Sequence, residues 1–156
     1  MIPKQFSIIG FLCLLCSLVT HSWAADSFVE QVSLLWEKGD KEEVLSIANK
    51  RILANNNDIA GLILQLEYQL AFLQLDKLPI TADKLRVVGD GISTENFRKI
   101  WPIVRADLET IKIMVPLYPR KQLDIDREKA KLPGKPMTYM KLLKAIEDDG
   151  LLQRHN

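Results

Sequence analysis

Histidine and cysteine are nearly absent from this 156-residue chain, which holds only two of each. Cys13, Cys16 and His21 all lie within the segment 1–24, and His155 is the second-last residue. The long stretch between them lacks the commonest general base, the thiol nucleophile and the side chains that most often bind transition metals. Catalysis would have to rest on carboxylates, hydroxyls or lysines, so we expect no enzyme, no metal site and no cofactor.

The chain also lacks an excess of charge of either sign once the segment 1–24 is set aside. That segment holds one basic residue, Lys4, and no acidic residue, so the segment 25–156 carries twenty basic and twenty acidic side chains. A neutral chain offers no broad basic surface to nucleic acid or to an acidic membrane face. Its length suits one compact domain with its own core.

The segment 1–24 has the composition of a cleavable signal peptide. Lys4 precedes an almost unbroken apolar run over residues 6–20, and small residues occupy the −3 and −1 positions of a cut before Ala25. A cut after Ala25 is the second choice, because it places Trp23 at −3. An uncleaved membrane anchor is the alternative, but a spanning helix needs about 20 apolar residues. We therefore expect an exported protein, periplasmic or secreted, with no stable membrane anchor after cleavage.

Apolar residues after the signal recur at helical spacing, and no segment shows the alternation of a strand. We therefore expect an all-α fold, either a short solenoid of antiparallel hairpins or an irregular bundle. The predicted division is a helical domain over 25–115, an irregular proline-rich arm over 116–136, and a C-terminal helix and tail over 137–156. The expected helices lie between Ser27 and Gly39, between Asp40 and Asn55, and over 59–75, 81–88, 94–115 and 139–148.

Capping residues mark the ends of several predicted helices. Ser27 and Glu30 have the spacing of a capping box, and Asp58 stands at the start of the third helix. Gly39 can end the first helix in the left-handed conformation open to glycine. Pro102 lies inside the fifth helix, where proline removes a backbone donor, so we expect a kink or two helices meeting there.

The 116–136 arm contains four prolines, which favour extended and turn conformations. We expect at most one helical turn within it, near residues 126–131. The segment Asp124–Glu128 is similar to the opening of a calcium loop, but Lys129 and Lys135 occupy the positions where that loop needs glycine and glutamate. A charged turn is the better interpretation.

An aromatic residue, Trp36, is followed by Gly39-Asp40, an acidic pair and the apolar Val44. This order resembles the centre of a tetratricopeptide repeat, in which a tight turn joins two closely packed helices. The first such unit covers about 27–58 and a second, degenerate one about 59–90, where Pro79 departs from the pattern. The resemblance implies hairpins that stack on their neighbours and present a concave face.

The resemblance implies a module that binds a protein or a peptide. The inner face of such a fold belongs to the first helix of each hairpin, so we expect polar contacts from exposed residues there: Gln31, Glu37, Gln65 and Gln69. Trp36 and Trp101 are aromatic candidates for the groove, although core packing is the commoner role of a tryptophan on an apolar stripe. Two alternatives stay open: a stand-alone structural or inhibitory bundle, and, more remotely, a carboxylate-based hydrolase.

Overall fold

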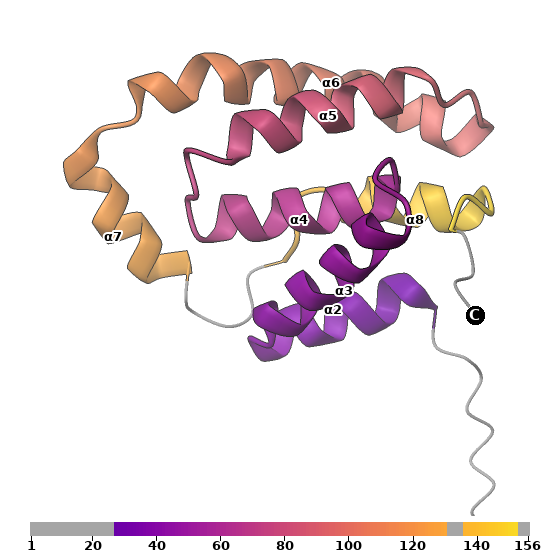
Figure 1. Cartoon of the computed structure of the whole chain (residues 1–156), viewed down its shortest axis with the longest axis horizontal. Helices are drawn as coiled ribbons and strands as arrows, with labels where there is room; N and C mark the ends of the chain where they lie inside the picture. Colours follow the sequence, from indigo (N-terminus) through magenta and orange to yellow (C-terminus); the bar gives the residue numbers. More distant parts are fainter. Residues whose placement is uncertain (1–26, 131–135, 153–156) are drawn as a thin grey trace, which may run out of the picture.

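The computed structural model describes residues 27–130 and 136–152 and confirms the all-α prediction. Within these residues it contains α-helices and one short 3₁₀ turn, and no strand (Figure 1). The predicted signal peptide lies outside the described part of the chain. The elements are α2 (Phe28–Lys38), α3 (Lys41–Ala54), α4 (Ile59–Ala71), α5 (Leu78–Asp90), α6 (Glu95–Met114), η1 (Val115–Leu117), α7 (Arg120–Ala130) and α8 (Met140–Asp148).

The first hairpin, α2 and α3, has the ends that its sequence predicts. Ser27 Oγ accepts from the Glu30 backbone N–H at 3.1 Å, and the Glu30 carboxylate accepts from the Ser27 backbone N–H at 3.2 Å. Gly39 ends α2 with φ 89°, a left-handed conformation that favours glycine. The turn lets Val32 and Trp36 of α2 pack with α3 in the core.

Helix α4 is the centre of the molecule, because it is buried around nearly its whole circumference. It packs against α3 on one side and α5 on the other, and α8 also contacts it. Asp58 caps its start by accepting from the Gly61 backbone N–H at 2.6 Å, and Arg51 of α3 binds the same carboxylate through two nitrogens at 2.7 and 2.8 Å. This buried, bidentate ion pair ties the two hairpins together at their junction.

The second hairpin, α4 and α5, differs from its prediction at the turn. Helix α4 ends at Ala71, short of the expected residue 75, and Leu73 adopts a positive φ of 47°. Pro79 does not merely end the preceding region; it stands in the first turn of α5, where a missing N–H costs nothing. Helix α5 is therefore longer than the predicted 81–88 and includes Gly89.

Helix α6 runs unbroken through Pro102, so of the two expectations there, a kink or two helices meeting, the second is wrong. Pro102 is exposed, which leaves water free to satisfy the carbonyl that loses its partner. Three neighbours on the opposite face, Trp101, Val104 and Leu108, are buried in the core. Their packing offsets the unfavourable effect of proline on the helix.

The expectation of an irregular arm after residue 116 is also wrong for part of its length. Residues 120–130 form the three-turn helix α7, which replaces the single helical turn predicted near 126–131. The prolines stand outside this helix, and Pro119 accepts from Gln122 and Leu123 at its start. Helix α7 lies at one end of the molecule, away from the other helices (Figure 1).

Helix α8 returns to the bundle and packs against α2, α4 and α6. Its inward side chains Leu142, Leu143 and Ile146 are fully buried. Successive helices from α2 to α6 pack on their neighbours, and α8 joins the last of these to the first. The helices thus form an irregular bundle closed by the C-terminal helix.

Candidate functional site

A cleft of about 350 Å³ opens between α2, α4, α6 and the segment that leads into α8. Pockets of a few hundred cubic ångströms are the usual size of sites that hold a small ligand or a few side chains. The lining mixes apolar surface with hydroxyls and two carboxylates: Trp36, Glu67, Leu70, Ala71, Asp107, Thr110, Ile111, Pro136, Thr138 and Tyr139.

Glu67 forms one wall of the cleft and is only 2% exposed. It stands on α4, and its carboxylate accepts from the backbone N–H of Tyr139, 72 residues further along the chain. This bond ties the segment before α8 to the central helix. Glu67 therefore holds the segment that lines the cleft in place and also contributes a carboxylate to the lining.

Tyr139 shows the electrostatic character of the cleft. Its side chain is buried, and burial is the largest cause that raises the pKa of its phenol. The charges of Asp107 and Glu67 raise the pKa further, because a tyrosinate would be repelled by both carboxylates. The two acids thus make the potential at the Tyr139 phenol more negative.

Trp36 reaches the cleft from α2 although it is only 3% exposed. The ammonium of Lys41 lies 5.1 Å from the centre of the Trp36 ring and 5.8 Å from that of Phe72. Lys41 is itself buried and does not line the cleft. Trp36 is therefore a core residue with part of its surface at the edge of the cleft.

The four predicted polar contact residues do not gather in the cleft. Gln31 and Glu37 are exposed on α2, and Gln65 is half-buried on α4. Gln69 is 4% exposed, so the prediction that it is an exposed contact residue is wrong. The reason is that α3, α5 and α8 surround α4 and leave it no exposed face of the kind that an open solenoid would have.

Trp101 lies away from the cleft, between α5 and α6, and is 7% exposed. Its indole Nε1 donates to the Asp90 carboxylate at 3.0 Å, and its ring stacks on Phe97 with centroids 5.1 Å apart. Arg105 also donates to Asp90, at 2.9 Å. These two hydrogen bonds hold the pKa of Asp90 below its ordinary value, and the bond from Arg105 has the larger effect.

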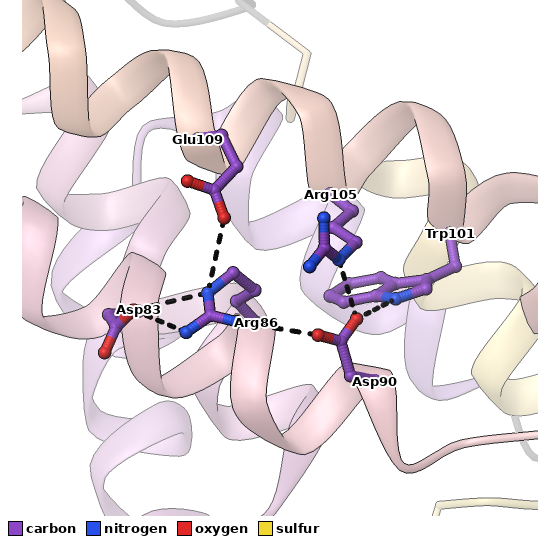
Figure 2. Close-up of polar contacts among 6 residues, drawn as sticks. All are labelled: Asp83, Arg86, Asp90, Trp101, Arg105 and Glu109. Carbon is purple, nitrogen blue, oxygen red and sulfur yellow. Dashed lines mark hydrogen bonds and ion pairs between the residues drawn. The ribbon is translucent and has the colours of Figure 1, made fainter.

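The same interface carries a second ion-pair centre, Arg86 (Figure 2). Its guanidinium lies 3.0 Å from Asp83, 3.6 Å from Asp90 and 3.5 Å from Glu109. The cluster of Asp83, Arg86, Asp90, Trp101, Arg105 and Glu109 therefore fastens α5 to α6. The hollow beside Asp83, Arg86 and Glu109 measures only about 10 Å³, so we assign the cluster a structural role.

A second groove, of about 440 Å³, runs between α6 and α8. Two of its cations are already paired with acids of their own helices: Lys99 with Glu95 at 2.8 Å, and Lys144 with Glu147 at 3.0 Å. Lys144 also pairs with Asp148 at 3.1 Å, whereas Lys141 in the same lining has no ion pair with any described residue. The groove is lined by Asn96, Lys99, Ile100, Met140, Lys141, Lys144, Ala145 and Asp148.

The sequence reasoning missed Glu67, Asp107 and Tyr139. One signal could have found Glu67, because it is the only charged residue of the otherwise uncharged α4. A lone acid on a buried helix must have a partner, and it is often part of a site. Asp107 carries no comparable signal, since acids are frequent on the exposed face of α6.

The carboxylates of the cleft bear on the hydrolase alternative. A carboxylate-based hydrolase needs two acids in one cleft, and Glu67 and Asp107 both line this one. However, the Glu67 carboxylate already accepts a hydrogen bond from the Tyr139 N–H. Within the described ranges, no group of three acids, histidines or cysteines is placed to hold a metal ion. No helix in residues 27–130 and 136–152 has the length and apolar character to cross a membrane.

Comparisons with known proteins add no relative to this description. No protein-family model, no curated protein and no solved structure matches the chain.

Proposed function

We propose that this protein is exported and acts as a protein- or peptide-binding module, with the cleft at Trp36, Asp107 and Tyr139 as its binding site. The observation that supports this most is the make-up of the cleft. It combines apolar walls with a few polar groups in a space large enough for one or two side chains of a partner.

The position of the cleft agrees with the repeat interpretation. The two proposed units, about 27–58 and 59–90, each contain a pair of consecutive helices, α2 with α3 and α4 with α5. The first helices of these pairs, together with α6, contribute side chains to the cleft. In a repeat protein of this kind, first helices line the concave face on which partners bind.

Helix α8 occupies much of the surface that would otherwise be that concave face. It contacts α2, α4 and α6 and buries Leu142, Leu143 and Ile146. The cleft is the part of the same face that α8 leaves uncovered. We therefore propose that a partner inserts a short segment or a single side chain beside the start of α8, and does not lie along the whole face.

The burial of α8 also favours a second candidate, a stand-alone structural or inhibitory bundle that uses its outer surface. In that case the cleft has no ligand, and filling it does not affect activity. The two candidates differ in one measurable respect, namely whether blocking the cleft abolishes binding.

A cleft-filling variant tests the proposal. Thr110 lines the cleft and is exposed, so Thr110→Trp should block it without disturbing the core. Peptides that bind the wild-type segment 25–156 are first selected from a displayed random library. They should bind the variant at least about tenfold more weakly than the wild type, equivalent to about 1.4 kcal/mol. Calorimetric titration measures this, and circular dichroism checks the fold.

Ile113→Trp is the matched control, because Ile113 is 66% exposed on the same helix and does not line the cleft. It should bind the selected peptides as the wild type does. If the peptides bind the wild type, Thr110→Trp and Ile113→Trp equally well, the peptide site lies outside the cleft. That result would support the stand-alone bundle.

A further inference from the structure

The charged residues that line the cleft are all of one sign, although the buried Lys41 ammonium lies behind Trp36. Among its ten lining residues two are acids, Glu67 and Asp107, and none is lysine, arginine or histidine. This imbalance is local, because the chain after residue 24 is neutral overall. A partner placed here therefore meets the exposed carboxylate of Asp107, with the buried carboxylate of Glu67 behind it, and no cation from the lining.

Asp107 differs from its two charged neighbours on the same turns of α6, Arg105 and Glu109. Arg105 and Glu109 face α5 and are committed to Asp90 and Arg86 (Figure 2). Asp107 lies between them in sequence and lines the cleft on another side of α6. In the described residues it makes no ion pair or side-chain hydrogen bond, and it is exposed.

The surroundings of Asp107 suit a long cationic side chain. Apolar surface from Leu70, Ala71 and Ile111 can cover the methylene groups of a lysine or arginine, while the charged end reaches a carboxylate. Thr110 and Thr138 add hydroxyl oxygens to the same lining. Trp36, which is 3% exposed and already has the Lys41 ammonium over its ring, adds only apolar surface at the edge of the cleft.

We propose that the cleft recognises a lysine or arginine side chain of a peptide segment, with Asp107 as its carboxylate partner. This inference rests on the proposed binding function and names its ligand chemistry. Glu67 contributes to the negative potential from the wall, while its bond to the Tyr139 N–H keeps it in place. The raised pKa of the Tyr139 phenol, due to burial and then to Asp107 and Glu67, agrees with that potential.

Defined peptide pools test the inference. Four dye-labelled hexapeptide pools, random except for a fixed central arginine, lysine, citrulline or glutamate, are titrated with residues 25–156 and followed by fluorescence anisotropy. Citrulline matches arginine in shape but lacks its charge. The arginine and lysine pools should bind at least about tenfold more tightly than the citrulline pool, and the glutamate pool should bind most weakly. Raised salt should reduce the difference in affinity between the cationic pools and the citrulline pool.

Asp107→Asn removes the proposed partner charge and keeps the side-chain shape. Because Asp107 is exposed and unpaired among the described residues, the variant should unfold at the wild-type temperature yet lose the preference for arginine over citrulline. Asp124→Asn is the matched control, an exposed acid on α7 outside the cleft, and should keep that preference.

The outcomes separate the two proposals. If arginine and citrulline pools bind the wild type equally, or if Asp107→Asn keeps the preference, the cationic ligand is wrong although peptide binding stands. If no pool binds the wild type at all, the binding function itself fails and the inference falls with it.

Discussion

Gly89 and Trp101 show how closely single residues are fitted in this small bundle. A methyl group built on Gly89 of α5 would lie 2.2 Å from the nearest indole carbon of Trp101 on α6. The indole cannot move away freely, because its N–H is bonded to Asp90 and its ring stacks on Phe97. Glycine is thus required here by close packing, although the residue lies inside a helix.

Gly89→Ala should therefore destabilise the protein by about 1–3 kcal/mol, the usual cost of overpacking a core. Urea unfolding followed by circular dichroism measures the change, and tryptophan fluorescence in a Trp36→Phe background reports it at Trp101. Gly91→Ala is the control, since its added methyl group would meet nothing closer than 3.4 Å, and it should stay within about 0.5 kcal/mol of the wild type. Equal stabilities for the two variants would contradict this account of the α5–α6 contact.

At the scale of elements, α8 supplies the cap that α6 lacks. Thr94 occupies the N-cap position of α6 but makes no capping hydrogen bond to the first turn. The carboxylate of Asp149, just past the end of α8, accepts from the backbone N–H of Phe97 at 2.9 Å and of Asn96 at 3.3 Å. It also accepts from the Asn96 side chain at 2.9 Å. A carboxylate at a helix N-terminus is favoured by the helix dipole as well.

These bonds make part of the stability depend on pH. Desolvation alone would raise the pKa of Asp149, but the hydrogen bonds donated by the start of α6 outweigh it and hold the pKa below its ordinary value of 3.8. The folded protein therefore keeps this carboxylate ionised at pH values where the unfolded chain binds a proton. The contribution is complete above the unfolded pKa and is lost as the pH falls through the folded one.

Asp149→Asn should lower the free energy of unfolding at pH 7, and the gap to the wild type should shrink steadily below about pH 4. Urea unfolding at pH 7, 5, 4 and 3 measures the gap. Asp124→Asn, on the isolated α7, should follow the wild type at every pH. A gap that stays constant down to pH 3 would show that the charge of Asp149 does not contribute.

At the scale of the whole molecule, the chain is expected to reach its final compartment without the segment 1–24. The first described element, α2, begins with the Ser27–Glu30 capping box, so a cut before Ala25 would leave this helix start intact. The same cut removes both cysteines and His21, the residues with the most reactive side chains.

Intact-mass analysis of the protein recovered from a secreting host should find a chain that starts at Ala25 or Asp26. Ala24→Leu is the control, because a bulky residue at −1 blocks signal peptidase, and it should leave the precursor uncut. A wild-type protein that keeps Met1 would overturn the export proposal without affecting the account of the fold.

Much of the fold followed from local patterns in the sequence. The helical class, the capping box at Ser27, the left-handed Gly39 and the Asp58 cap were predicted and are confirmed. Of the six residues proposed for the site, Trp36 lines the cleft, the other five do not, and Gln69 is buried. Gln65 and Gln69 were placed on an exposed face because the sequence does not show that α3, α5 and α8 surround α4.

The sequence by itself determined where most helices begin and end, because caps, glycine turns and apolar periodicity act within a few residues of one another. Only the tertiary structure decided what lies next to what. The Glu67–Tyr139 bond spans 72 residues, and Asp149 caps a helix whose first turn lies far before it in the chain. Such contacts form only after distant helices pack together, so the cleft and its two acids result from the packing of α2, α4, α6 and the segment before α8, and not from any local motif.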